Sequence, residues 1–263
     1  MKKHIYMGTN TKMYKNIVQT VRYLKRFDAA TQHISREYLT LFVIPSYTSL
    51  LSARFCVSRE KILIGAQNMC WEEEGQFTGE ISPLMLQEVG VDLVEIGHSE
   101  RRNIFGETDD QVRLKVKAAV EHGFTALLCV GETVQEKHAG FTHKVLRRQL
   151  EIGLQNMSRS QAGQIWVAYE PTWAIGVNGK PVAPEYVAEQ HDVIRHVLMD
   201  CLGAEAGAII PVLYGGGVNL KNALSLIQLD HVDGLFVGRA AWHADAFASM
   251  IELVLQSVFE KEI

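Results

Sequence analysis

Eight short apolar segments recur along the chain, and longer stretches with a helical period separate them. In the stretch after the first segment, for example, Ile17, Val21 and Leu24 recur at the spacing of a helical turn. Such alternation predicts parallel strands joined by helices, and strands that are apolar almost throughout fit a sheet covered on both faces. We therefore expect an α/β fold, a (β/α)8 barrel with strands in segments 4–8, 39–44, 62–66, 93–97, 126–130, 165–169, 210–214 and 235–237.

The length of the chain suits one such barrel. Its 263 residues are near the size of a single (β/α)8 domain and suffice to bury a large core. Glycine and proline are scattered over the expected loops, and no low-complexity or linker segment interrupts the pattern. We expect residues 1–263 to form one domain.

The charge and the hydropathy of the chain indicate which kinds of binding partner to expect. The formal net charge is −4 and no long basic run occurs, so neither nucleic acid nor an anionic membrane is an expected partner. No segment approaches the ~18 apolar residues of a membrane span, and the basic N-terminus lacks the apolar core of a signal peptide. The four cysteines, Cys56, Cys70, Cys129 and Cys201, show no metal-binding spacing, and we interpret them as reduced structural residues. These features predict a cytoplasmic protein that binds a small molecule.

Polar or glycine-rich segments follow four of the expected strands. Glu170 ends the sixth strand and opens a loop that is bounded by Pro171 and Gly176. Comparable segments are residues 8–12 after the first strand, 96–102 after the fourth and 213–219 after the seventh. Since the loops after the strands meet at one end of a parallel barrel and carry the chemistry of such enzymes, we expect one active site there. The loop after Glu170 is suited to close over a substrate.

These segments resemble the triosephosphate isomerase family over nearly the whole chain and in the same order. The resemblance rests on Asn10, Lys12 and the segments 65–68, 77–80, 98–102, 129–132, 170–176 and 237–238. It implies a TIM barrel that isomerises a small phosphorylated sugar by proton transfer through a cis-enediol or enediolate, as an intramolecular oxidoreductase. It implies neither cofactor nor metal, and the sequence contains no dinucleotide-binding fingerprint and no phosphate-binding P-loop.

The resemblance assigns roles to five side chains at the ends of the expected strands. Glu170 becomes the base that removes a proton beside a carbonyl, and an apolar lid over it would raise its basicity by excluding water. His98, expected at the start of a short helix, becomes a neutral donor to the substrate oxygen. Lys12 and Asn10 stabilise the negative charge that develops, and Glu100 becomes an active-site carboxylate near Lys12.

Each of these residues also has an interpretation without catalysis. A glutamate at a strand end is often a surface residue, a lone histidine is usually structural, and a lysine just beyond a strand is usually solvated. Glu100 precedes two arginines, and a salt bridge would explain it as well. However, a barrel that only binds phosphate would have little reason to keep Lys12, His98 and Glu170 together. An unrelated epimerase or synthase barrel would lack the segments around His98 and Glu170, so we expect an enzyme.

The substrate phosphate is expected at glycine-rich turns, where backbone N–H groups converge on an anion. Gly176, Gly216, Gly217 and Gly238 stand where the family's phosphate-binding loops lie, although a run of glycines alone commonly means only a tight turn. Gly217 replaces a serine that is usual in the family, and Arg239 replaces a second glycine. We expect the Arg239 guanidinium either to bind the anion or to pair with a neighbouring carboxylate.

Two further departures from the family pattern lie in the same segments. Thr11 replaces a customary tryptophan, and the lid, with residues 177–181, is about one residue longer than usual, with Pro181 stiffening its second hinge. Together with Gly217 and Arg239, these changes predict a paralogue for a four-carbon ketose phosphate that converts L-erythrulose 1-phosphate to D-erythrulose 4-phosphate. The alternative is the three-carbon reaction, between dihydroxyacetone phosphate and glyceraldehyde 3-phosphate.

The segment 75–80 resembles the loop that inserts into a neighbouring subunit in this family. The resemblance implies a homodimer in which Thr78 approaches the partner's Asn10 and the partner's Glu100. A flexible polar hairpin is the simpler interpretation of the same residues.

Overall fold

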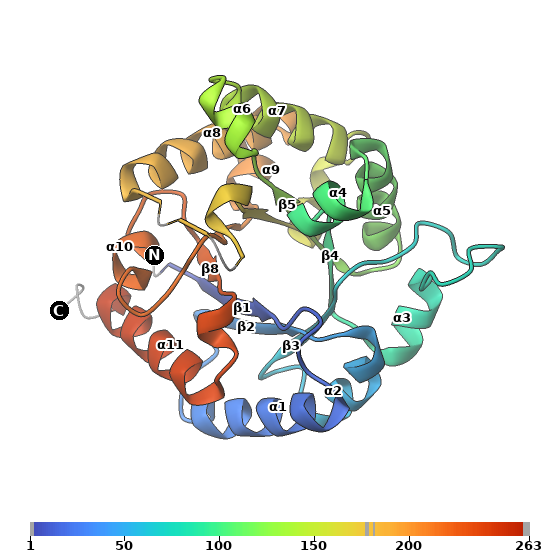
Figure 1. Ribbon diagram of the computed structural model, residues 1–263, viewed down its shortest axis with the longest axis vertical. Coiled ribbons are helices and arrows are strands. Elements are labelled where there is room, and N and C mark those ends of the chain that lie inside the picture. Colours follow the sequence, from blue (N-terminus) through green and yellow to red (C-terminus); the bar gives the residue numbers. More distant parts are fainter. Residues whose placement is uncertain (1–2, 177–178, 181, 260–263) are drawn as a thin grey trace.

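Eight parallel strands form a closed barrel (Figure 1). The computed structural model describes residues 3–176, 179–180 and 182–259. The strands are β1 Ile5–Asn10, β2 Leu39–Ile44, β3 Leu63–Ala66, β4 Leu93–Ile96, β5 Thr125–Val130, β6 Ile165–Tyr169, β7 Val212–Tyr214 and β8 Gly234–Phe236. Each strand pairs with the next one in the sequence, and β8 closes the ring on β1, where Leu235 is level with Met7. The predicted (β/α)8 barrel is confirmed.

The strand boundaries differ from the expected ones by a few residues. β1 continues beyond residue 8 as far as Asn10, so Asn10 belongs to the strand rather than to the loop. β7 begins at Val212 instead of residue 210. Pro211, just before it, has no N–H to contribute to the ladder, although its carbonyl accepts a hydrogen bond of 2.9 Å from Val167 N.

Helices surround the barrel on its outside (Figure 1). They are α1 Ile17–Thr31, α2 Leu50–Cys56, α3 Pro83–Val89, α4 Ser99–Phe105, α5 Asp109–Glu121, α6 Val134–His138, α7 Thr142–Gly153, α8 Pro184–Leu202, α9 Ala204–Ile209, α10 Ala223–Ile227 and α11 Ala244–Phe259, with short 3-10 turns at Tyr47–Ser49, Arg159–Gln164, Thr172–Ala174 and Arg239–Ala241. Local sequence sets where several of them begin. Asn16 and Gln19 form a capping box before α1, and Thr108 and Gln111 form one before α5.

Two apolar layers stabilise the barrel, one inside the ring of strands and one between strands and helices. The inner layer is built around aromatic rings, with the Phe42 centroid 5.6 Å from those of both Trp166 and Phe236. Gly8 is required there, because a Cβ at this position would lie 2.1 Å from the Phe42 ring. Filling the interior in this way leaves only the mouth of the barrel for a ligand.

Two features of the outer surface concern contact with a membrane and with other protein chains. Among the described residues, no helix is both long enough and apolar enough to cross a membrane. The connection between β3 and α3 projects away from the barrel (Figure 1), and its residues 72–80 are all exposed.

Candidate active site

The predicted site residues gather at the carboxyl ends of the strands. Asn10 is the last residue of β1, His98 lies in the turn between β4 and α4, and Glu170 directly follows β6. Lys12 and Glu100 line the same pocket as these three side chains. The structure therefore brings together the five residues that were expected to carry the chemistry.

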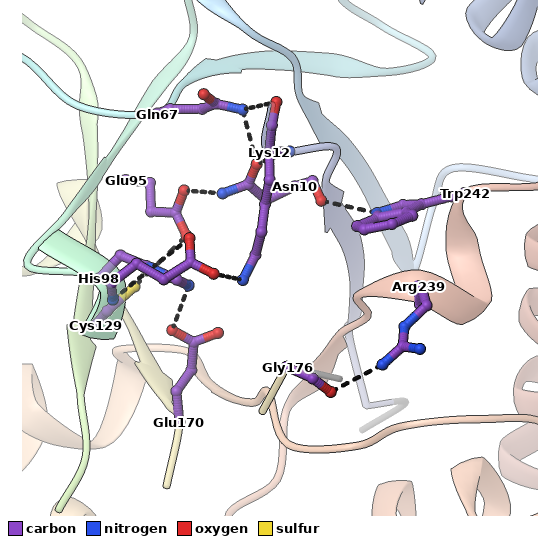
Figure 2. A network of polar contacts seen from close by, with 11 residues as sticks. Asn10, Lys12, Gln67, Glu95, His98, Cys129, Glu170, Gly176, Arg239 and Trp242 are labelled. Carbon is purple, nitrogen blue, oxygen red and sulfur yellow. Dashed lines mark hydrogen bonds and ion pairs between the residues drawn. The ribbon is translucent and has the colours of Figure 1, made fainter. Parts of the chain in front are cut away.

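Lys12 is held in an uncommon backbone conformation. Its φ of 50° lies in the left-handed region, which residues other than glycine seldom adopt. Asn10 Oδ1 accepts a hydrogen bond of 2.6 Å from Lys12 N, and Gln67 Nε2 donates to both Asn10 Oδ1 and Lys12 O at 2.9 Å. These contacts fix the turn and direct the ammonium group into the pocket (Figure 2).

The ammonium group of Lys12 remains charged at neutral pH. Its Nζ lies 2.6 Å from Glu100 Oε1. Burial lowers the pKa of Lys12, but the hydrogen bond to Glu100 and the negative charges of Glu170 and Glu100 outweigh burial and raise it overall. A fixed cation in a largely buried site stabilises an oxyanion strongly.

His98 is a buried, neutral imidazole. Burial and the positive charges of Lys12 and Arg101 lower its pKa to about 3. Its Nδ1 accepts a hydrogen bond of 3.1 Å from Glu100 N at the start of α4, so the ring proton is on Nε2. Nε2 points toward Glu170 Oε2 at 3.5 Å (Figure 2), which leaves its proton available to a substrate oxygen between them.

The surroundings of Glu170 suit a general base. Its side chain is only 6% exposed, and burial raises its pKa to about 7, against the opposing charge of Lys12. Oε2 has no hydrogen-bond partner among the described residues, so it is free to accept a proton. Gly215 leaves room for the side chain, because a Cβ there would lie 2.9 Å from Glu170 Cγ.

Glycines and one arginine line the other side of the pocket. The expected phosphate-binding residues Gly176, Gly216, Gly217 and Gly238 all reach it, together with Arg239. Gly176 and Gly217 have φ values of 83° and 61°, which favour glycine. Backbone N–H groups of such turns form concave sites that suit an anion.

The start of the lid is anchored on a buried carboxylate, Glu132. Its Oε1 accepts hydrogen bonds of 2.8 Å from Trp173 Nε1 and 2.9 Å from Tyr186 Oη, and its Oε2 accepts one of 3.2 Å from Tyr169 Oη. Lys137 Nζ lies 3.5 Å from the centre of the Trp173 ring. These contacts hold the turn after Glu170 in place.

The family follows from comparison with known sequences. A sequence model described as triosephosphate isomerase matches residues 5–254 of this chain. The chain belongs to the triosephosphate isomerase family. The resemblance expected from the motifs is thereby confirmed, and the activity is that of an isomerase.

Individual members of the triosephosphate isomerase family match almost the entire chain. A protein of Rhizobium etli named L-erythrulose-1-phosphate isomerase is 44% identical over 97% of this chain and 94% of its own length. A protein of the same name from Rhizobium meliloti is 40% identical over 98% of this chain and 99% of its own. The crystal structure of triosephosphate isomerase from Bartonella henselae is 34% identical, has a TM-score of 0.85, and covers 96% of this chain and 99% of that one.

The structure shows the surroundings of two of the departures from the family pattern. Within the described residues Arg239 forms no ion pair with a carboxylate, and its Nη2 donates a hydrogen bond of 2.8 Å to the carbonyl of Gly176, at the start of the lid (Figure 2). It still lines the pocket with an exposed side chain. Thr11, which directly follows β1, is fully buried and is not among the residues that line the pocket. The proposed stiffening of the lid by Pro181 falls outside the described residues, as do residues 177 and 178.

Thr78 does not join the site of its own chain. It is exposed on the projecting connection between β3 and α3, and it is absent from the pocket that the other predicted residues line. Any contact with Asn10 and Glu100 therefore requires a second copy of the chain.

Sequence reasoning missed Glu95, a buried carboxyl group on β4. Asn10 Nδ2 donates a hydrogen bond of 2.6 Å to its Oε2, and the thiol of Cys129 lies 3.9 Å from its Oε1 (Figure 2). Cys129, interpreted as purely structural, thus borders the site. The only available signal was a charged residue in the middle of an expected apolar strand.

The group of buried residues most suited to hold a metal ion consists of Glu95, His98 and Glu170. One potential ligand atom from each lies within 4.8 Å of the others. Lys12 already supplies a cation to both carboxyl groups, which disfavours a second one at close range. We assign His98 and Glu170 to proton chemistry instead.

Proposed function

We propose that this chain interconverts L-erythrulose 1-phosphate and D-erythrulose 4-phosphate through a cis-enediolate. The observation that carries the proposal is the buried pair of Glu170 Oε2 and His98 Nε2, which are 3.5 Å apart. A base with a pKa of about 7 beside a neutral donor is the pair that proton transfer next to a carbonyl needs. The names of the Rhizobium relatives support the four-carbon substrate.

In the proposed reaction one proton changes carbon and the carbonyl moves one position. Glu170 removes the proton from C3 of L-erythrulose 1-phosphate, and the electron pair shifts toward the C2 carbonyl oxygen. The Nε2 proton of His98 and the charge of Lys12 stabilise the enediolate. Glu170 then returns its proton to C2, while the hydroxyl proton on the C3 oxygen passes to the C2 oxygen through Nε2 of His98. The oxygen on C3 becomes the new carbonyl, the oxygen on C2 becomes a hydroxyl, and the product is D-erythrulose 4-phosphate. Atoms and electrons balance in this isomerisation without any oxidant or reductant.

The substrate phosphate is proposed to bind at the glycine-rich side of the pocket. The N–H groups of Gly216, Gly217 and Gly238 supply the donors, and Arg239 adds a positive charge. Because Arg239 also contacts the Gly176 carbonyl, an anion there would lie against the lid as well. Closure of the lid would then shield the enediolate from water and from loss of phosphate.

Kinetics with four- and three-carbon substrates test the proposal. We expect a higher kcat/KM for L-erythrulose 1-phosphate than for dihydroxyacetone phosphate or glyceraldehyde 3-phosphate. An extra hydroxymethyl in a merely permissive pocket changes binding by only about 1–3 kcal/mol, whereas dedicated polar contacts discriminate by several powers of ten. Equal or better efficiency with the three-carbon substrates would assign the chain to the reaction named for the Bartonella relative.

We further propose that the chain acts as a homodimer, in which the projecting connection with Thr78 inserts beside the partner's Asn10 and the partner's Glu100. A groove next to Lys12, lined by Asn10, Gln67, Glu100 and Tyr47, is open to receive it. Light scattering at assay concentration tests this assembly. A fully active monomer would contradict it.

A further inference from the structure

Glu95 is the buried ionisable group that the proposed mechanism leaves unexplained. It is 1% exposed, and across the part of the chain that the structure describes it forms no ion pair with a lysine or an arginine. Its one strong hydrogen bond comes from Asn10. A carboxyl group buried with so few partners lowers stability, so a role in binding or catalysis is the expected reason for its presence.

The surroundings of Glu95 favour the neutral form of its carboxyl group. Burial, followed by the negative charge of Glu170, raises its pKa well above the ordinary value, and the charge of Lys12 opposes this only in part. Asn10 Nδ2 donates to Oε2, which assigns the acidic proton to Oε1. Among the described residues, the hydrogen-bond partner of Oε1 is the Cys129 thiol, at the long distance of 3.9 Å. A ligand hydroxyl at a shorter distance would replace this weak contact.

The position of Glu95 matches the end of the substrate that lies farthest from the phosphate. Figure 2 shows Glu95 on the same side of the site as Glu170 and on the opposite side from Arg239, with Lys12 between Glu95 and Arg239. Its carboxyl also lies within 4.8 Å of the reactive atoms of His98 and Glu170. It also lines the groove that contains Asn10, Lys12 and His98, three residues that the catalytic pocket shares with this groove.

The carbon that Glu170 deprotonates determines where the extra hydroxymethyl group of a four-carbon substrate lies relative to Glu95. Glu170 must contact the carbon that it deprotonates, at roughly 3–3.5 Å. In L-erythrulose 1-phosphate that carbon carries a hydroxymethyl group where the three-carbon substrate has a second hydrogen. The terminal hydroxyl is two bonds away from this carbon, which brings it within reach of a group beside both Glu170 and His98.

We propose that Glu95 determines specificity: its carboxyl group hydrogen-bonds the terminal hydroxyl of the four-carbon substrate and so selects it over three-carbon sugars. The inference rests on the proposed function. Asn10 and Gln67 position the carboxyl, since Gln67 holds Asn10 Oδ1 and thereby directs Asn10 Nδ2 to Glu95. A neutral acid can both donate to the hydroxyl and accept from it.

The test compares two variants on two substrates that differ only in that hydroxyl. The variants are Glu95→Leu, which removes the hydrogen bond at similar volume, and Glu95→Gln, which keeps a donor and an acceptor. The substrates are L-erythrulose 1-phosphate and its 4-deoxy analogue, 3-hydroxy-2-oxobutyl phosphate. We expect the ratio of their kcat/KM values to fall by about 10²-fold or more in Glu95→Leu, and to change by less than about tenfold in Glu95→Gln.

A parallel loss on both substrates in Glu95→Leu, or an unchanged ratio, would overturn the proposal. If Glu95→Leu does not fold, as judged by thermal unfolding, Glu95→Asp provides the same readout, because it withdraws the carboxyl by one bond and should lower the ratio at least about tenfold. Kinetics of the wild-type enzyme distinguish a failure of the proposed function from a failure of the proposed role of Glu95. No preference for L-erythrulose 1-phosphate over dihydroxyacetone phosphate would refute the proposed function, whereas a preference that survives the loss of Glu95 would refute this inference alone.

Discussion

The two ends of the site are built differently. The groups at the proton-transfer end are buried side chains that are already held in place, whereas those at the phosphate end are backbone turns and an exposed arginine. Glu170 and His98 are about equally buried, at 6% and 5% exposed. Arg239, by contrast, has an exposed side chain whose contact is to the lid. The buried end is arranged before substrate binds, and we expect the open end to be completed when the lid closes.

The difference follows from what each end must do. Proton transfer requires shifted pKa values, and burial is the largest cause of the shifts in both Glu170 and His98. A phosphate must instead enter and leave, so an open set of N–H donors with a movable cover is suitable. We expect changes at the buried end to affect turnover and changes at the open end to affect KM.

The largest effect is expected at the buried end, from Glu170→Asp. This change withdraws the carboxylate by about one bond, and a misplacement of about 1 Å costs on the order of 10²-fold in rate. Steady-state kinetics should show a fall of that size in kcat, with KM little changed. Wild-type turnover in this variant would mean that Glu170 is not the base.

A second prediction concerns pH and also tests the buried end. Glu170 must be ionised to accept a proton, and burial raises its pKa to about 7. We therefore expect kcat/KM to fall about tenfold for each pH unit below about 7 and to level off above it. The profile should be read against the titration of the substrate phosphate, whose second pKa is about 6. A flat profile down to pH 5 would contradict the raised pKa of Glu170.

A smaller effect is expected at the open end, from Arg239→Gly. A hydrogen bond to a charged group is worth about 1.5–3 kcal/mol, so KM should rise about tenfold or more for every phosphorylated substrate while kcat changes less. Arg239→Lys is the matched control, because it keeps the charge. Its KM should lie between that of the wild-type enzyme and that of Arg239→Gly. If KM stays at the wild-type value in Arg239→Gly, the side chain serves only to hold the Gly176 carbonyl.

The barrel could be predicted because its signal is local, since each expected strand was a short apolar run. The five candidate catalytic residues could be predicted because the segments that contain them resemble those of the family, and His98 and Glu170 each stood directly after an expected strand. The contact of Arg239 could not be predicted, since Gly176 lies 63 positions away and its carbonyl direction depends on the lid.

Glu95 was missed for a related reason. Its apolar neighbours predicted a buried strand, but whether its side chain points inside the barrel depends on a partner 85 positions away, Asn10. Thr11 shows the reverse case: it was counted among the changes that predict a different substrate, but it is fully buried and does not line the pocket.

The most direct test of the central claim is to incubate L-erythrulose 1-phosphate with the enzyme in D2O and to follow the reacting carbons by NMR. If Glu170 carries a proton between C3 and C2, deuterium from solvent should replace the hydrogen on the reacting carbon of both isomers over many turnovers. Glu170→Gln should abolish conversion and exchange together. Interconversion with that hydrogen fully retained would indicate direct hydride transfer between the carbons and would contradict the account.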